Sequence, residues 1–149
     1  MTRRKRTDVF SKKKRSEIMR AVKGRDTAPE VKIRKALFAR GFRYRLNDRR
    51  LPGSPDLVFP KHNAVLFVHG CFWHGHDCAR GRRQPKTNVD YWREKIARNV
   101  KRDRSAIAAL RRLGWRVRIS WECDLKDVRR AANKIAGWLL LSTSEGRPR

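Results

Sequence analysis

The sequence predicts an α/β fold in which a mixed β-sheet is flanked by helices, and three observations lead to this prediction. Helical and strand-like patterns alternate along most of the chain. A length of 149 residues suits one hydrophobic core. Neither an internal repeat nor an interior linker divides the chain. We therefore expect one domain over residues 16–142, with a disordered basic arm before it (1–15) and a frayed tail after it (143–149).

The N-terminal residues predict an arm and a short helix. Residues 1–15 carry eight Lys or Arg and one acid, a composition typical of a disordered arm that can lie along phosphates. The segment "SEIMRAVKGRD", residues 16–26, can form a short helix that ends at Gly24. We expect the folded domain to begin with this helix.

The segment "TAPEVKIRKALFARG" predicts a clearer helix. Thr27 can cap it, the proline fits its first turn, and Glu30 completes a capping box. Gly41 stops it. Helical spacing places four apolar residues on or beside the inner face: Ile33, Ala36, Leu37 and, alongside them, Phe38.

Three short strands are expected next. They are "FRYRL" (42–46), "PDLVF" (55–59) and "AVLFVH" (64–69), with "LPGSP" and "PKHN" as the turns between them. The first alternates between polar and apolar residues, so we expect it to be half exposed. The run "VLFV" is continuously apolar, which is typical of a central strand.

A long helix, a fourth strand and a final helix complete the expected fold. The long helix runs from about Val89 to Leu113, "WRVRIS" (115–120) is the strand, and Asp124 is the expected cap of the last helix. Apolar residues recur in the long helix near helical spacing, at Trp92, Ile96, Val100, Ile107 and Leu110.

The charge of the chain points to a polyanionic partner. Forty Lys and Arg against fourteen acids give a net charge of +26, and the basic residues persist along the whole chain. Nucleic acid is the simplest partner for such a field, and a merely solvated basic surface is the alternative. No apolar run approaches the length of a membrane span. Three cysteines suit no closed disulfide framework, so we expect a reducing cytoplasm.

The stretch "HGCFWHGHDC" (69–78) predicts a metal site. Cys71 and Cys78 lie close to several histidines, and Cys123 follows the last strand, where it can reach the same loop. Structural zinc takes four thiolate or imidazole ligands, which three cysteines and one histidine would supply. Spacing alone leaves His74 and His76 both open as the fourth ligand. The alternative is a core cysteine and surface histidines.

Asp56 is the best candidate for a magnesium carboxylate, because "PD" opens a strand at a sheet edge. Its ordinary role would be to support a turn. Many nucleases pair such a "PD" with an acid-x-lysine on the next strand, but here that strand has neither residue. His69 and His74 could replace that motif, because histidine can activate water near neutral pH. The alternative is that each of these two histidines binds zinc or is simply a polar residue at the surface.

The residues also carry a family likeness. The segments "RDTAPE", "LPGSPDLVF", "FVHGCFWHGHDC", "YWREKIARNVKRDR" and "LGWRVRISWEC" occur in this order, and with them the chain resembles the very short patch repair endonucleases. These bacterial enzymes nick DNA 5′ to the thymine of T:G mismatches that arise when 5-methylcytosine deaminates. The resemblance covers about residues 16–123. It implies a restriction-endonuclease-like fold, one structural zinc ion and catalytic Mg²⁺.

The resemblance also implies a role for each matching residue. The zinc ligands would be Cys71, His76, Cys78 and Cys123. The catalytic residues would be Asp56, which holds Mg²⁺, with His74, His69 and Glu30. The residues on DNA would be Phe72, Trp73 and Trp92 as aromatics that enter the duplex, with Met19, Lys95 and Asn99. The implied partners are duplex DNA with a T:G mismatch, mismatch-repair proteins and, functionally, a cytosine methyltransferase. We expect a monomer.

One position departs from the family pattern. Val68 stands where the best-known members carry threonine. If this residue binds Mg²⁺ through its backbone carbonyl, valine in place of threonine would affect activity little. Two other functions remain open: a restriction-type nuclease or nickase with another target, and a non-catalytic zinc module that binds nucleic acid. A purely structural basic protein is a third, and the Cys/His cluster argues against it.

Overall fold

The computed structural model describes residues 27–141, and its centre is one four-stranded mixed sheet. The strands lie in the order β1 (Arg45–Leu46), β2 (Leu57–Phe59), β3 (Ala64–His69) and β4 (Arg116–Trp121). Both β1–β2 and β2–β3 pair antiparallel, whereas β3 and β4 pair parallel over six residues each. The mixed sheet is as predicted. The basic arm, the helix expected at 16–26, Met19 and the tail at 143–149 lie outside the described residues.

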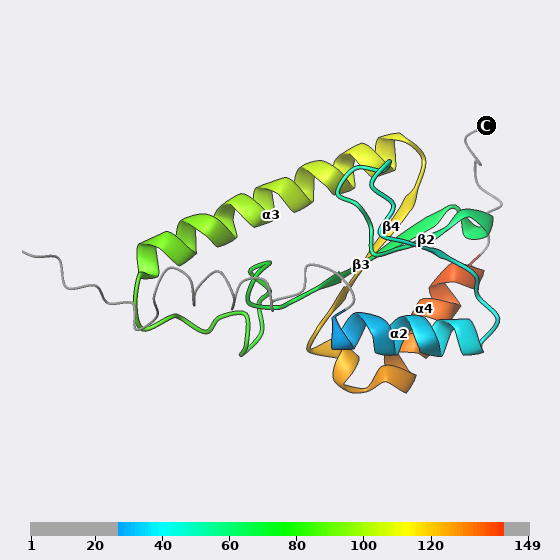
Figure 1. Cartoon of the computed structure of the whole chain (residues 1–149), viewed down its shortest axis with the longest axis horizontal. Coiled ribbons are helices and arrows are strands. Elements are labelled where there is room, and N and C mark those ends of the chain that lie inside the picture. The colour runs from blue at the N-terminus through cyan, green and yellow to red at the C-terminus, as the bar shows by residue number, and fades with distance from the viewer. Residues whose placement is uncertain (1–26, 142–149) are drawn as a thin grey trace, which may run out of the picture.

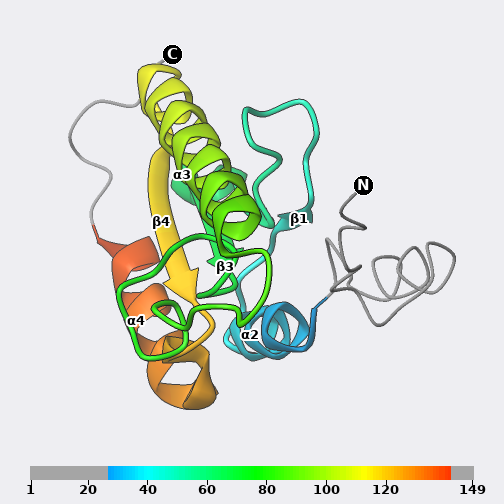
Figure 2. The same ribbon diagram turned by 90° about the vertical axis from the view of Figure 1, so that its left-hand side faces the viewer.

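Helices cover both faces of the sheet. α3 (Val89–Arg112) crosses over between β3 and β4 on one face, and α2 (Ala28–Ala39) lies beside α4 (Val128–Leu140) on the other (Figures 1 and 2). Alternate residues of β2 and β3 therefore enter two separate cores. Leu57, Phe59, Ala64 and Leu66 pack with α2 and α4, whereas Val58, Val65 and Phe67 pack with Leu110 of α3. Burial on both faces explains why "VLFV" has no polar residue.

α2 begins as the sequence predicts, with one difference. The Thr27 Oγ1 accepts a hydrogen bond from the Glu30 N–H at 3.4 Å, which caps the first turn. The Glu30 side chain itself is buried and lies against Asp56. Ile33 and Leu37 are fully buried as expected, but Phe38 is 52% exposed, so its expected place beside the core was wrong. Its ring contacts Tyr44 and the Arg43 guanidinium at the surface instead.

The first strand is shorter than predicted because its first residues close the preceding helix. The Phe42 N–H donates to the Leu37 carbonyl, and the Tyr44 hydroxyl donates to the Arg34 carbonyl. This leaves only Arg45 and Leu46 to pair with β2. Gly41, with a φ of +92°, makes the turn after α2, as the sequence predicts. β2 begins at Leu57, so Pro55 and Asp56 precede the strand rather than belong to it.

The predicted cap of the last helix was wrong. Asp124 begins a short 3-10 turn, η2 (Asp124–Lys126), and Asp127 caps α4 by accepting the Arg130 N–H at 3.1 Å. The reason is Leu125, which is buried, so the chain must turn inward before the helix starts. The long helix ends at Arg112, one residue before its predicted end.

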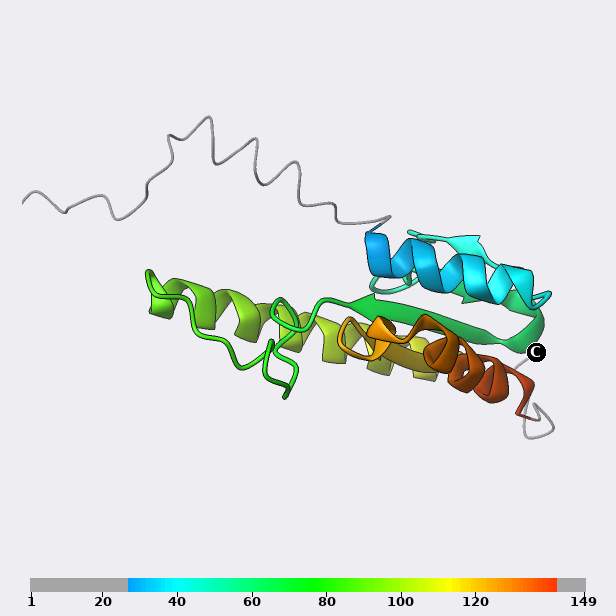
Figure 3. The same ribbon diagram turned by 90° about the horizontal axis from the view of Figure 1, so that it is seen from below.

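One end of the molecule projects beyond the sheet. After β3 the chain forms a long loop, residues 70–88, which returns along the N-terminal half of α3 past the end of the strands (Figures 1 and 3). At the opposite end a second 3-10 turn, η1 (Pro60–His62), joins β2 to β3. Within residues 27–141, no helix combines the length and apolar character that crossing a membrane requires.

Candidate active site and metal centre

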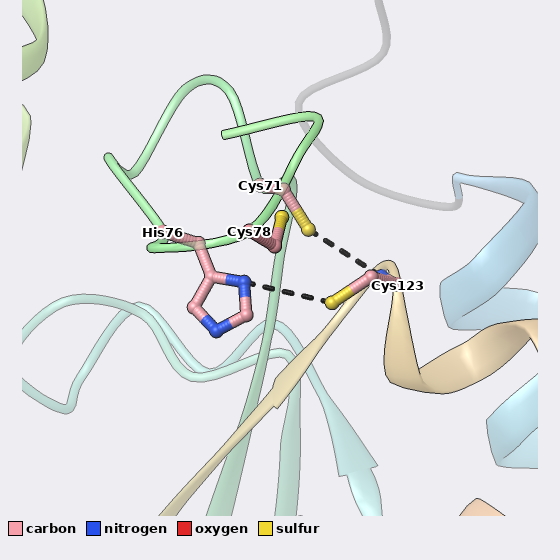
Figure 4. A group of neighbouring side chains, drawn as sticks. All are labelled: Cys71, His76, Cys78 and Cys123. Carbon is pink, nitrogen blue, oxygen red and sulfur yellow. Dashed lines mark hydrogen bonds between the residues drawn. The ribbon is translucent and has the colours of Figure 1, made fainter. Parts of the chain in front are cut away.

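Three cysteines and one histidine converge where the loop after β3 meets the end of β4. Cys71, His76 and Cys78 come from the loop and Cys123 from the turn after β4, and their side chains point toward one another (Figure 4). One ligand atom from each lies within 4.8 Å of the others. Three thiols and an imidazole are a donor set that structural zinc sites use, so this cluster fits a zinc ion.

Neighbouring groups orient these ligands. The Gly81 N–H donates to the Cys78 Sγ at 3.3 Å and lowers the pKa of that thiol to about 7, whereas burial raises the pKa of Cys71 to about 12. The His76 ring stacks on Trp121, with 4.1 Å between ring centroids. In metal sites the surrounding residues commonly donate hydrogen bonds to the ligands and fix the orientation of the imidazole, and the contacts described here do both.

A pair of carboxyl groups lies at the start of β2. The Asp56 carboxyl hydrogen-bonds the buried Glu30 side chain, and Oδ2 accepts the Val68 N–H at 2.6 Å. Burial, together with the Glu30 carboxyl, raises the pKa of Asp56 to about 8. Two acids held this close repel each other when both ionise, and a divalent cation would relieve that repulsion. Carboxylates are also the protein ligands that Mg²⁺ prefers, so the pair fits Mg²⁺.

Two histidine rings lie face to face at the end of β3. The rings of His69 and His74 stack with 3.8 Å between centroids and an angle of 5°. The His74 Nδ1 lies 2.6 Å from the Asp103 Oδ2 of α3. An aspartate that accepts the Nδ1 proton leaves the lone pair on Nε2, which can then accept a proton from water. The three residues also form a cluster that could hold a metal ion.

His69 is the more enclosed of the two histidines. Its side chain is 4% exposed, and its Nδ1 is buried without a hydrogen-bond partner among the described residues. Burial, with a smaller contribution from His74, lowers the pKa of His69 to about 4. The ring is therefore neutral at neutral pH, and its geometry suits it to hold the His74 ring in place.

These groups open into one cleft of about 650 Å³. Asp56, Val68, His69, His74 and Asp103 all line it. Its walls come from the β1–β2 loop, the end of β3 and the middle of α3. The cleft thus brings Asp56 of the carboxyl pair together with the histidine pair. The carboxyl pair can hold a cation, and the histidine pair can move a proton.

An aromatic cluster lies beside this cleft on the projecting end. The ring centroids of Phe72, Trp73 and Trp92 lie between 5.2 and 5.9 Å apart. The Lys95 Nζ lies 5.6 Å from the Trp73 and Trp92 ring centroids. The Asn99 side chain donates to the Trp73 carbonyl at 3.0 Å, and its Oδ1 accepts from Arg102. Five of the six residues expected on DNA are therefore neighbours.

Two residues of the site were not predicted from the sequence. Asp103 belongs to "NVKRDR", where it is one charge among many, and no spacing rule connects it to His74. Trp121 stacks on His76 and meets His69 edge-on at 5.3 Å. The only available signal for Trp121 was its place two residues before Cys123.

Comparison with known proteins gives concordant matches. The profile of a family described as DNA mismatch endonuclease Vsr matches residues 7–80. A type II nicking enzyme of Neisseria meningitidis serogroup A is 48% identical over 121 residues, which are 81% of this chain and 86% of the relative. One of Xanthomonas oryzae is 48% identical over 122 residues, 82% of this chain and 89% of the relative. The DNA mismatch endonuclease Vsr of Escherichia coli is 47% identical over 119 residues, 80% of this chain and 76% of the relative.

Proposed function

Because this chain belongs to the DNA mismatch endonuclease Vsr family, we propose that it uses Mg²⁺ to nick duplex DNA 5′ to the thymine of a T:G mismatch left by 5-methylcytosine deamination. The chain is a DNA endonuclease, and the proposal adds the lesion, the position of the nick and the metal. The observation that carries it is the single cleft lined by Asp56, which hydrogen-bonds the buried Glu30 side chain, and by the His74–Asp103 pair.

The carboxyl pair would hold the metal. Asp56 and Glu30 supply carboxylate oxygens, and the Val68 backbone carbonyl adds a further oxygen at the same edge of the sheet. Mg²⁺ bound there would place positive charge beside the scissile phosphate and make a nearby water more acidic. This use of Val68 needs no side-chain hydroxyl.

The histidine pair would move the proton. The His74 Nε2 takes a proton from the attacking water while Asp103 keeps the ring in the right tautomer and His69 supports its face. The water oxygen forms a bond to phosphorus, and the bond from phosphorus to one deoxyribose oxygen breaks. That oxygen takes up a proton, so water and one phosphodiester become a phosphate monoester and a hydroxyl.

The aromatic cluster would select the lesion. Phe72, Trp73 and Trp92 can insert between base pairs, and insertion costs least where pairing is already weak. Lys95 and Asn99 lie beside these rings and would contact the same site, with Met19 in the opposite groove. Zinc on the four-residue cluster would fix the loop that carries His74 and two of the aromatics.

A T:G duplex in a methyltransferase-type sequence context, with its perfectly paired twin, tests this proposal. We expect a single nick 5′ to the mismatched thymine, only with Mg²⁺ and only in the mismatched duplex. Asp56→Ala should abolish the nick and still bind DNA, because it leaves the basic surface intact. Equal nicking of both duplexes would contradict the proposed lesion.

A second candidate is a nickase with another target, since relatives in Neisseria and Xanthomonas are named type II nicking enzymes. It predicts cleavage that does not prefer T:G, which the same pair of duplexes measures. A restriction-endonuclease-like core, a monomeric state, a link to a cytosine methyltransferase and contact with mismatch-repair proteins are further parts of the proposal. Family membership disfavours a non-catalytic zinc module.

A further inference from the structure

Strand β3 lacks the positively charged side chain that many nucleases place beside the metal site. β3 reads "AVLFVH", so it carries no lysine beside the metal site. The acids Asp56 and Asp103 both line the cleft, and wherever they are ionised their negative charge opposes the entry of a phosphate. Attack on a phosphodiester adds negative charge to its non-bridging oxygens, and cations placed there stabilise the transition state. Mg²⁺ at the carboxyl pair would supply part of this positive charge, and a positively charged side chain in the cleft would add to it.

Arg49 and Arg102 are the two Lys or Arg residues that line the cleft in the described part of the chain. They come from different elements. Arg49 lies in the loop between β1 and β2, and Arg102 lies in α3 one residue before Asp103. A guanidinium keeps its charge at any working pH and matches two phosphate oxygens at once.

The loop that carries Arg49 is tied to the metal carboxylate by its backbone. The Asn47 N–H donates to the Asp56 carbonyl at 3.1 Å, which continues the β1–β2 pairing by one residue. Asp48 accepts both the Arg50 N–H and the Arg50 side chain, at 2.9–3.0 Å, which shapes the turn. Arg50 is therefore ion-paired, whereas Arg49 has no ion-pair partner among residues 27–141 and faces the cleft.

Arg102 is oriented by its own helix. Its Nη2 donates to the Asn99 Oδ1 at 3.0 Å, one turn earlier on α3, which leaves its other N–H groups for a ligand. Asn99 is held in turn by the Trp73 carbonyl. The guanidinium is thus linked through Asn99 to the aromatic cluster, and it lines the same cleft as the His74–Asp103 pair.

We propose that Arg49 and Arg102 bind the non-bridging oxygens of the scissile phosphate and supply the charge that an acid-x-lysine motif would otherwise provide. The proposal rests on the proposed nuclease mechanism, but it concerns the phosphate and not the lesion. The two arginines donate hydrogen bonds only, and no proton leaves them.

Single-turnover nicking with saturating enzyme tests the proposal. We expect Arg49→Ala and Arg102→Ala each to lower the rate constant by roughly tenfold to a hundredfold, with at most about a threefold change in Kd. Arg50→Ala and Arg104→Ala are matched controls outside the cleft, because each removes one arginine charge from the same loop or helix, and Arg50→Ala keeps the backbone N–H that Asp48 accepts in the turn. Both controls should nick within about threefold of the wild-type rate.

Two further readouts separate a phosphate contact from a structural role. Guanidinium ion at constant ionic strength should restore part of the lost rate in Arg102→Ala and leave the rate of Arg104→Ala unchanged. A methylphosphonate at the scissile position removes one charge from the DNA. Its Kd penalty without Mg²⁺ should be clear for the wild type and Arg50→Ala, and should disappear in the Arg49→Ala, Arg102→Ala double variant.

The outcomes distinguish this proposal from the proposed function. If the wild type nicks a paired duplex as well, the proposed lesion fails, and the arginine variants are measured on that duplex. Arg49→Ala and Arg102→Ala that nick at the control rates would overturn the phosphate contact, as would a methylphosphonate penalty that persists in the double variant. No nicking by the wild type on either duplex would overturn the proposed function, and this proposal with it.

Discussion

His74 is the residue whose surroundings are most closely defined. Asp103 binds one of its nitrogens, and the His69 ring covers one of its faces at 3.8 Å between centroids. A proton acceptor that must be aligned with an attacking water gains from both restraints, because each limits the rotation of the ring. The His74–Asp103 bond also decides which nitrogen carries the proton.

Asp103→Asn should expose this dependence. The amide can donate to Nδ1 and so favour the wrong tautomer, which would lower the single-turnover nicking rate by at least about tenfold while Kd stays within about twofold. Glu94→Gln, an exposed residue of the same helix, is the matched control and should nick at the wild-type rate. Wild-type nicking by Asp103→Asn would rule out a role for this hydrogen bond.

The raised pKa of Asp56 predicts how folding stability depends on pH. Its pKa rises from an ordinary 3.8 to about 8 on folding, so between these values the folded chain binds more protons than the unfolded chain. The free energy of unfolding therefore falls as pH rises through that window. Above the window, ionised Asp56 destabilises the fold by its full amount. At low pH, where the group is protonated in both states, the cost vanishes.

Asp56→Asn should remove this cost, because the amide oxygen can still accept the Val68 N–H and the amide can donate to Glu30. In Mg²⁺-free buffer at about pH 8 we expect a gain of at least about 1 kcal/mol, which is about 2–4 °C in Tm for a chain of this size. The gain should shrink toward about pH 4. Mg²⁺ should raise the Tm of the wild type but not of the variant, and a pH-independent gain would refute the shifted pKa.

At the scale of elements, α3 carries residues of both proposed functions, recognition of the lesion and catalysis. It is 24 residues long, about 36 Å, and its projecting half carries Trp92, Lys95 and Asn99 while its middle carries Arg102 and Asp103. The loop from 70 to 88 connects β3 to this helix and holds three of the four residues of the Cys/His cluster. A shift of the helix would therefore move the aromatics and the His74 partner together.

The space around Gly81 shows how closely this loop is packed. A Cβ at this position would lie 1.8 Å from the His76 carbonyl oxygen, so Gly81→Ala must displace the backbone that carries a metal ligand. We expect the variant to lose most of its bound zinc and its nicking activity. Elemental analysis should find about one zinc per wild-type chain, because the proposed mechanism uses His69, His74 and Asp103 for proton transfer and not as ligands of a second zinc.

Gly137→Ala is the control for this substitution. A Cβ there would meet nothing within 4 Å, and the residue lies inside α4. Alanine is the better helix former, so this variant should gain about 0.4–1 kcal/mol and keep its zinc. Full zinc content in Gly81→Ala would mean that the loop is loose enough to relax around the new methyl group.

At the scale of the whole molecule, the charge of +26 governs DNA binding. Forty Lys and Arg stand against only fourteen acids, so most of the positive charges have no acidic counterpart and phosphate contacts should dominate the affinity. Such contacts release counterions from the DNA, and the release makes affinity fall steeply with salt.

Paired and mismatched duplexes should therefore show the same steep salt dependence, with a slope of log K against log salt of about −5 or steeper. Deletion of residues 1–15, which carry eight basic residues, should make the slope shallower for both duplexes by an equal amount. A titration by fluorescence anisotropy measures both slopes. An unchanged slope after the deletion would show that the arm does not contact phosphates.

The sequence by itself determined the parts of this protein that depend on local spacing. Helix and strand periodicity placed the long helix to within one residue and β3 without error, because each pattern reflects burial along one element. The Cys/His stretch was visible because three of its four converging residues lie within eight positions.

Only the tertiary structure decided contacts between distant elements. The first strand shortened because Phe42 closes α2, and the last helix began later because Leu125 turns inward. The structure also brought Glu30 against Asp56, Asp103 against His74, and Arg49 and Arg102 to one cleft. Spacing could not reveal these pairs, because each joins residues whose distance depends on how the helices pack on the sheet.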